Sequence, residues 1–259
     1  LAKMPNLREL YLCQQEITDL SPLSELSLRE LNLADNQIDD LSPLASIPSL
    51  QLLYLGNNPL ADLSPLSSLE LLRVLNLDAI DRSHLDSFAP LSGLEMLEQL
   101  SLNNRIPADG NWSPLGELDE VWEIWLWDPP DRAFAGLAEM AGLRDLYMGG
   151  YGADSLRAVD LPRLHLLSLY DMPYSLEGIE QMTSLEWLNL CGMGPVSLEP
   201  VTWSDSVHTI NITDCRFEDY TPLLRVPGMK EVGAWDETCL QGLERDCPEG
   251  TRTFQVTGP

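Results

Sequence analysis

The sequence predicts an α/β repeat solenoid, with a parallel β-sheet on the concave face of a horseshoe and short helical or 3-10 turns on its convex face. A unit of about 22 residues recurs along the 259-residue chain, and each copy opens with apolar residues at alternating positions. Such alternation is typical of a strand that is buried on one face. One unit buries too little apolar surface to fold alone, so stacked units are needed to form a continuous core.

The recurrence is clearest near the start of the chain, in LRELYLCQQEITDLSPLSELS from Leu7 and LRELNLADNQIDDLSPLASIPS from Leu28. The same frame gives eleven starts, at residues 7, 28, 50, 72, 97, 121, 143, 164, 185, 207 and 229. Residues 1–6 match the end of a truncated repeat, and residues 236–259 no longer repeat. We therefore expect one domain over residues 1–259 with a C-terminal cap at 236–259, and we expect it to be a fragment of a longer protein.

The pattern LxxLxLxxN resembles the leucine-rich repeat family, and the 22-residue unit with DLSPLxxL is most similar to its bacterial internalin class. The resemblance covers almost the whole chain and implies a non-catalytic module that recognises proteins. The Ser-Pro pair after each early strand suits the start of a helical turn, with serine as the cap and proline at the first helical position. The expected capping residues are Ser21, Ser42 and Ser64, followed by Pro22, Pro43 and Pro65.

The asparagine position departs from the family pattern after the third repeat. It holds Gln15, Asn36, Asn58, Ile80, Arg105, Pro129, Tyr151, Met172, Met193, Cys215 and Glu237. The family resemblance implies an asparagine ladder that satisfies backbone groups inside the stack. From the fourth repeat onward we expect backbone turns or buried water to take over this task. The fourth and fifth repeats also carry extra residues after their strands.

Composition restricts the classes of partner. The net charge of −26 argues against nucleic acid, and no apolar run is long enough to span a membrane. This negative charge favours a protein partner with a basic or mixed basic–apolar surface. The five cysteines form no CxxC pair, which fits reduced thiols in a cytoplasmic protein, although Cys239 and Cys247 are close enough in sequence to form a disulfide.

A candidate protein-binding site follows from the register of the repeats. Positions 1, 4 and 6 should face the core, and positions 3, 5 and 7 should face the concave surface, with position 2 on the flank and position 8 beside it. Over the sixth to ninth repeats these outer positions gather aromatic and acidic side chains, namely Trp122, Glu123, Trp125, Trp127, Asp128, Asp145, Tyr147, Tyr170, Asp171 and Trp187. Aromatic residues are enriched at binding hot spots, and carboxylates beside rings suit a partner's arginine or lysine. Alternatively, the rings only stiffen the sheet through cross-strand pairs.

A secondary loop site is expected where the strands of repeats four to six end. These longer loops carry Arg82, His84, Arg105 and Arg132. Their side chains suit an acidic group on a partner, or they only relieve repulsion in a chain rich in carboxylates.

Catalysis is not expected. The three histidines lie in different repeats without metal-ligand spacing, and neither a phosphate-binding loop nor a nucleophile motif occurs. We expect no enzyme, metal or cofactor. The chain also resembles the leucine-rich sensor region of bacterial NLR-like (NACHT-type) proteins, which implies a cytoplasmic ligand sensor. The alternatives are an internalin-like surface adhesin that binds a host or matrix protein, and repeats that dock only against their own N-terminal signalling domain.

Overall fold

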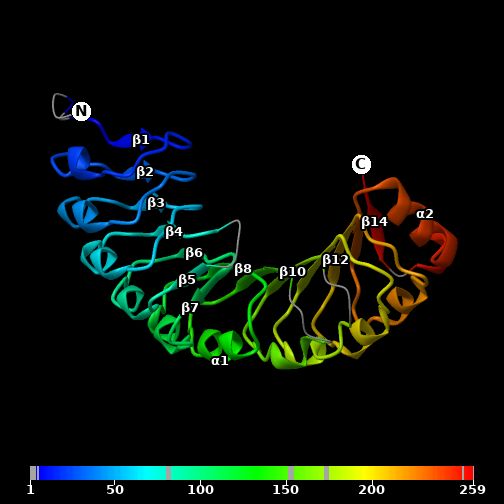
Figure 1. Ribbon diagram of the computed structural model, residues 1–259. Helices are drawn as coiled ribbons and strands as arrows, with labels where there is room; N and C mark the ends of the chain where they lie inside the picture. The colour runs from blue at the N-terminus through cyan, green and yellow to red at the C-terminus, as the bar shows by residue number, and fades with distance from the viewer. Residues whose placement is uncertain are drawn as a thin grey trace. The chain divides into compact units, whose positions relative to one another are not determined.

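The computed structural model describes residues 4, 6–79, 83–150, 155–171, 175–252 and 254–258. They form two compact units, the first from Leu1–Trp127 with Ala135–Leu143, and the second from Asp128–Phe134 with Arg144–Pro259. Helix α1 (Arg132–Ala138) crosses this boundary in the sequence. In each unit a short strand alternates with a short turn, and the strands lie side by side (Figure 1).

The first unit contains one parallel sheet, whose strands follow one another in chain order. They are β1 (Glu9–Tyr11), β2 (Glu30–Asn32), β3 (Leu52–Tyr54), β4 (Val74–Asn76), β6 (Gln99–Ser101) and β8 (Glu123–Trp127). Equivalent repeat positions pair with one another, as Leu53 does with Leu75. The predicted register of the repeats is therefore confirmed here.

The second unit repeats the arrangement with longer strands. They are β9 (Asp145–Gly149), β10 (Leu166–Tyr170), β11 (Trp187–Cys191), β12 (Thr209–Thr213), β13 (Glu231–Ala234) and β14 (Gln255–Thr257). Strand β14 lies in the segment where the sequence stops repeating, and it still pairs in parallel with β13. Helix α2 (Glu237–Asp246) precedes it, and Asp236 caps this helix by accepting the Cys239 N–H at 2.9 Å.

The turns on the other side of the strands are mostly 3-10 helices of three to five residues, as predicted. They are η1 (Ser21–Leu23), η2 (Ser42–Ser46), η3 (Ser64–Ser68), η4 (Ala89–Leu91), η5 (Ser113–Glu117), η6 (Leu156–Ala158), η7 (Ile179–Gln181), η8 (Glu199–Trp203), η9 (Thr221–Arg225) and η10 (Glu249–Thr251).

The expected capping residue is wrong in the first three turns. The serine is the first residue of the turn and its side chain makes no cap bond, and the proline stands second. The cap is the aspartate two residues before the serine, whose Oδ1 accepts the serine N–H at 2.8 Å; these residues are Asp19, Asp40 and Asp62. These hydrogen bonds with the serines hold the pKa of each carboxyl below its usual value.

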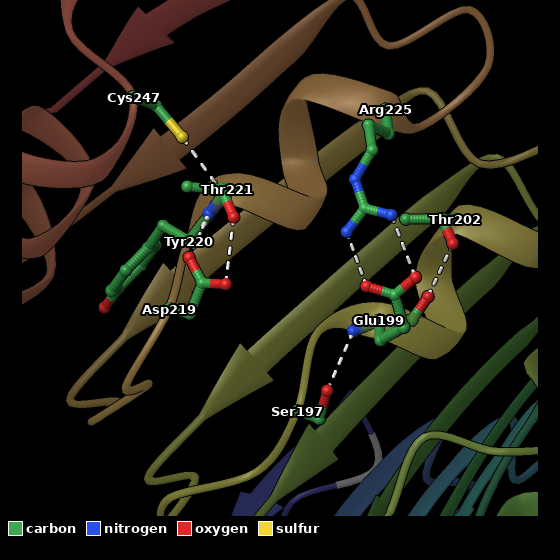
Figure 2. Close-up of polar contacts among 8 residues, drawn as sticks. All are labelled: Ser197, Glu199, Thr202, Asp219, Tyr220, Thr221, Arg225 and Cys247. Atoms are coloured by element: carbon green, nitrogen blue, oxygen red, sulfur yellow. Dashed lines mark hydrogen bonds and ion pairs between the residues drawn. The ribbon is translucent and has the colours of Figure 1, made fainter.

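Figure 2 shows the same turn chemistry in the second unit. Ser197 Oγ accepts the N–H of Glu199 at 3.1 Å, and Asp219 Oδ1 accepts the N–H of Thr221 at 2.8 Å. The carboxylate of Glu199 also receives both terminal nitrogens of Arg225, at 3.0 and 2.5 Å, which joins η8 to η9. In these turns, as in the first three, a polar side chain that precedes the turn accepts the N–H of its first residue.

Positions 1, 4 and 6 of the repeats form the core, as predicted. In the sixth repeat these are Val121, Ile124 and Leu126, and all three are buried. Full burial of a side chain of this size contributes about 1.5–3 kcal/mol. Because repeats two to eleven each supply three buried positions, their remaining strand positions are available for other tasks.

The extra residues of the fourth and fifth repeats form a small sheet of their own. Strands β5 (Ser83–Leu85) and β7 (Arg105–Pro107) pair in parallel beside the main strands. Arg82, one of the residues expected in the secondary loop site, lies outside the described residues.

An asparagine ladder fills the interior of the early repeats, as the family resemblance implies. The side chain of Asn58 donates to the carbonyls of Leu33 and Leu55 at 2.9 and 3.0 Å, and its Oδ1 accepts the N–H of Ile38 at 3.0 Å. Asn36 bonds in the same way to the first repeat, where its Oδ1 accepts the N–H of Gln15. Each asparagine thus joins two repeats through groups that would otherwise be unsatisfied.

Arg105 takes over this ladder, and its expected place in a partner-binding loop is wrong. Only 2% of Arg105 is exposed. Its Nε donates to the carbonyl of Leu77 at 2.6 Å, and one terminal nitrogen donates to the carbonyl of Asn58 at 3.0 Å. The guanidinium reaches back across two repeats, because the fourth repeat holds Ile80 where the ladder needs a polar group. Burial lowers the pKa of Arg105, and the nearby carboxylate of Asp78 raises it.

Cysteine thiols continue the ladder in the second unit. Cys215 Sγ accepts the N–H of Met193 at 3.4 Å and donates toward the carbonyl of Leu190 at 3.3 Å. Cys239 Sγ likewise accepts the N–H of Cys215 at 3.3 Å. All five cysteines are free, so Cys239 and Cys247 form no disulfide. In these repeats thiols, rather than the backbone turns that we expected, bond to interior backbone groups.

Candidate functional site

The predicted site divides into two groups of residues, one in each compact unit. In the first unit Trp122 precedes β8, and Glu123, Trp125 and Trp127 lie on it. Trp122 is 37% exposed and the other three are half-buried. The indole N–H of Trp125 donates to Glu123 Oε1 at 2.9 Å, which fixes both side chains on the strand face that points away from the core. We call this face of the strands, made by positions 3, 5 and 7, the open face.

Backbone conformation accounts for the aspartates at position 8. Asp128 and Asp171 have φ angles of 52° and 51°, in the left-handed region, where the strand turns away from the sheet. Asn and Asp tolerate this region better than other non-glycine residues, and Gly150 and Gly192 occupy the same position in other repeats. The residue type at Asp128 and Asp171 is therefore explained without a ligand.

In the second unit Trp187 is exposed, at 40%. It lies in one row with Asp145, because both pair with Leu166 from opposite sides. Its ring packs edge-on against that of His208, with the ring centres 5.5 Å apart. Nε2 of His208 lies 3.4 Å from a carboxylate oxygen of Glu186. Sequence reasoning placed Trp187 on this face and missed the histidine and glutamate beside it.

Tyr147 and Tyr170 are both half-buried on the open face of the second unit, but they do not share a row. Tyr147 pairs with Ser168, whereas Tyr170 pairs with Gly149 and Cys191. Burial raises the pKa of the Tyr170 hydroxyl.

Side-chain hydrogen bonds cross the strands of the second unit at position 5. Asn189 donates to Ser168 Oγ, and Asn211 donates to Asn189 Oδ1, both at 2.8 Å. The indole of Trp235 is within 3.4 Å of Asn211 Oδ1. This chain of polar groups fixes the amides of the open face in one orientation.

The sequence did not predict a hollow in the open face of the first unit. It lies over β3, β4, β6 and β8, and its volume is 370 Å³. Tyr54, Asn76, Ser101 and Trp125 are paired neighbours across these four strands, so two large rings stand on either side of two small polar side chains. The remaining lining residues are Val74, Leu75, Asp78, Gln99, Leu100, Asn103 and Glu123. We refer to it as the Tyr54–Trp125 hollow.

Hydrogen bonds within the protein hold the polar floor of this hollow. Oδ1 of Asp78 accepts the hydroxyl of Ser101 at 2.5 Å and the N–H of Asn103 at 2.9 Å. Oδ2 of Asp78 accepts the side-chain N–H of Asn76 at 2.8 Å. Burial and the nearby charge of Glu30 raise the pKa of the Tyr54 hydroxyl, as expected for a partly desolvated phenol in a negative field.

Two of the ten predicted primary residues, Glu123 and Trp125, line this hollow. Arg132, from the predicted secondary site, is exposed at the first position of α1. The sequence signal for the hollow is the order of residues at position 5, which reads Tyr, Asn, Ser, Trp over repeats three to six.

The described part of the chain holds no group of histidine, cysteine and acidic residues arranged to bind a metal ion. Among the same residues, no helix is long and apolar enough to cross a membrane.

Comparison with known proteins bears on the fold. The family model for leucine-rich repeats (2 copies) matches residues 26–68. No curated protein matches the sequence. The structure of an internalin from Listeria monocytogenes is similar at 22% sequence identity and a TM-score of 0.60, over 95% of this chain and 80% of that one. A leucine-rich repeat protein from Leptospira interrogans is similar at 20% identity and a TM-score of 0.62, over 100% of this chain and 69% of that one.

These identities are low, and the likeness to the solved structures concerns the fold. The matched repeats, the parallel strands with 3-10 turns, and the asparagine ladder at Asn36 and Asn58 all agree with it. The chain therefore has the leucine-rich repeat fold.

Proposed function

We propose that this chain is a non-catalytic module that recognises a protein partner through the open face of its strands. Leucine-rich repeat domains generally bind proteins, and no enzymatic family is indicated. The observation that carries the proposal is the Tyr54–Trp125 hollow, in which aromatic and acidic side chains stand at positions that the core does not need. Strands hold these side chains rigidly, so little conformational entropy is lost on binding.

The character of the partner follows from charge. Residues 1–127 contain six lysines and arginines against twenty aspartates and glutamates. A partner with a basic or mixed basic–apolar surface would be drawn to such a domain and would be oriented by it. The exposed Trp187, with Glu186 next to it in the chain and Asp145 two strands away in the same row, gives the second unit a surface of the same chemistry.

We propose a cytoplasmic setting, as the ligand-sensing region of an NLR-like bacterial protein. The support is the thiol ladder, because Cys215 and Cys239 act as interior hydrogen-bonding groups only while they are reduced. An oxidising compartment would favour disulfides or oxidised sulfur over such thiols. An internalin-like adhesin, the second candidate, would have to keep all five cysteines free outside the cell.

A display selection tests the recognition function. A library of displayed peptides and small domains is panned on the immobilised chain, and each binder is measured again on Trp125→Leu and Trp187→Leu variants. Trp203→Leu is the matched control, since Trp203 is exposed on η8, in a turn rather than on the open face. We expect binders that lose affinity for one of the first two variants and keep it for the control. Binders that are indifferent to both open-face variants would contradict the proposal.

A further inference from the structure

We propose that the Tyr54–Trp125 hollow binds the guanidinium group of an arginine from the protein partner, stacked on Trp125 and hydrogen-bonded to the carboxylates beside it. The inference rests on the proposed recognition function and adds to it the site and the chemical group that is recognised. Four features of the hollow support it: its use of hydrogen-bond donors, its charge, its width and its volume.

Several hydrogen-bond donors of the hollow are already used within the protein. The amide of Asn76, the hydroxyl of Ser101 and the N–H of Asn103 all donate to Asp78. The indole N–H of Trp125 donates to Glu123. What remains toward the solvent is rich in acceptors, since each carboxylate oxygen has more than one lone pair. A ligand that brings several donors and no acceptor is complementary to this surface.

The negative charge of the hollow also favours a cationic ligand. Asp78 and Glu123 line it, and its described lining contains no lysine or arginine. Arg105 lies close enough to Asp78 to feel its charge, but it is buried and donates to the carbonyls of Leu77 and Asn58. It offsets part of the charge of Asp78, and Glu123 stays uncompensated. Anionic ligands are therefore repelled and cations are favoured.

The width of the hollow determines how a cation would lie in it. Tyr54 and Trp125 are three strand spacings apart, which places their backbones roughly 14 Å from each other. This is too wide for both rings to enclose one side chain. The cation must instead lie over the small side chains of Asn76 and Ser101 and stack on one ring. Trp125 is the better ring, because tryptophan is the strongest cation–π partner and Glu123 is hydrogen-bonded to it.

Arginine fits these conditions better than lysine. Its planar guanidinium stacks flat on an indole while its edge still directs several N–H groups to carboxylates, which a compact ammonium cannot do at once. The volume of 370 Å³ is at the low end of the range for ligand pockets, about 300–1,000 Å³. This volume suits one long side chain with part of its backbone, rather than a helix.

Three peptides test the inference on the whole 259-residue chain. Each is acetylated and amidated and alternates glycine with arginine, with lysine or with citrulline, the neutral isostere of arginine. Binding is measured by calorimetry and by the shift of the Trp125 indole N–H signal in a ¹H–¹⁵N spectrum. We expect the arginine peptide to bind tightest, the lysine peptide to bind more weakly, and the citrulline peptide to bind about tenfold or more weaker than arginine.

Variants separate the hollow from the general negative charge of the protein. Trp125→Leu is expected to weaken the arginine peptide about three- to tenfold, and Glu123→Gln about threefold. The matched controls are Trp203→Leu and Glu120→Gln, which remove a ring and a charge at exposed positions outside the hollow, and they should change affinity less than about twofold. Circular dichroism confirms that each variant is folded.

Several results would overturn the inference. The inference fails if the arginine peptide does not bind, or if the citrulline or lysine peptide binds as tightly as the arginine peptide. It also fails if the control variants weaken binding as much as the hollow variants do. The failures of the two proposals are distinguishable. Selected binders that depend on Trp125 but contain no arginine would refute the guanidinium site and leave the recognition function intact. Binders that ignore the open face altogether would refute the recognition function itself.

Discussion

Arg105 is the buried side chain whose removal should perturb the first unit most clearly. We predict that Arg105→Ala destabilises the protein by about 3 kcal/mol, although the residue was expected on the surface. The guanidinium donates to the carbonyls of Leu77 and Asn58 inside the stack. Alanine keeps the backbone of β7 and removes both donors, so the carbonyl of Leu77 loses the guanidinium and that of Asn58 keeps only the N–H of Leu60 at 2.8 Å.

The magnitude follows from these contacts. A hydrogen bond to a charged group contributes about 1.5–3 kcal/mol, so the two bonds of the guanidinium give about 3–6 kcal/mol. Two effects reduce the loss. Water can enter the vacated polar space and bond to the carbonyls. The variant also no longer buries a charge, whose unfavourable desolvation lowers the pKa of Arg105. A value of about 3 kcal/mol corresponds to a fall of roughly 6–12 °C in melting temperature for a chain of this size.

The assay is urea unfolding at pH 7 followed by circular dichroism, together with native-state hydrogen exchange. The second measurement is needed because repeat arrays can unfold in parts. Exchange should accelerate at Ile38, whose N–H is bonded to Asn58, and should not change in the second unit, for example at Met193. The matched control is Arg132→Ala, which removes an exposed arginine and should change stability by less than about 0.5 kcal/mol.

The reasoning would be refuted if Arg105→Ala unfolds within about 0.5 kcal/mol of the parent protein. It would also fail if exchange accelerates equally in both units, because the effect would then be global. Arg105→Met tests the chemistry directly, since it fills the space without supplying a donor. We expect it to lose stability as well, and full stability in this variant would show that volume matters and hydrogen bonds do not.

Three other predictions concern the groups that hold the repeats together. Asn58→Ala should cost about 3 kcal/mol in urea unfolding, since it leaves the N–H of Ile38 and the carbonyl of Leu55 without partners and removes one of the two donors to the carbonyl of Leu33. A triple variant with asparagine for the capping aspartates at 19, 40 and 62 should lose less stability in acid than the parent. The pKa values of these three carboxyls are lowered in the folded protein, so their ionised forms stabilise the fold above the unfolded pKa near 3.9. This stabilisation is lost as the pH falls through the folded pKa values. The urea midpoints of both proteins between pH 2 and 6 measure the loss. A thiol reagent in native buffer should label Cys13 and Cys191 and leave the three buried cysteines unlabelled until denaturant is added, as judged by mass spectrometry. Burial raises the pKa of Cys215 to about 11 and that of Cys239 to about 12.

The repeat register was predictable from the sequence because its physical cause is local. A leucine at position 4 or 6 has the same neighbours in every repeat, so the alternation alone identifies the core, as at Ile124 and Leu126. The position of Trp125 and Trp187 on the open face follows from the same alternation. Strand β14 was missed because it pairs with the sheet without repeating the leucine pattern.

The role of Arg105 was not predictable in this way, because it depends on reach through space. Its count within the repeat placed it correctly at the asparagine position. What the count does not give is that a long side chain can turn inward and bond to a carbonyl 47 residues earlier. The thiols of Cys215 and Cys239 were missed for a related reason. The family pattern has asparagine at this place in the repeat, and here sulfur accepts the interior N–H groups instead.

Each position of the repeat can now be assigned to a cause. Positions 1, 4 and 6 fill the core, position 8 needs a residue that tolerates the left-handed region, and the asparagine position satisfies interior backbone groups. The core does not dictate the side chains of the open face, although hydrogen bonds hold several of them and Gly233 has no room for a larger side chain. The two large side chains that flank Asn76 and Ser101 at position 5, Tyr54 and Trp125, fill no core position. We therefore propose that Trp125 stands there to bind the partner rather than to stabilise the fold.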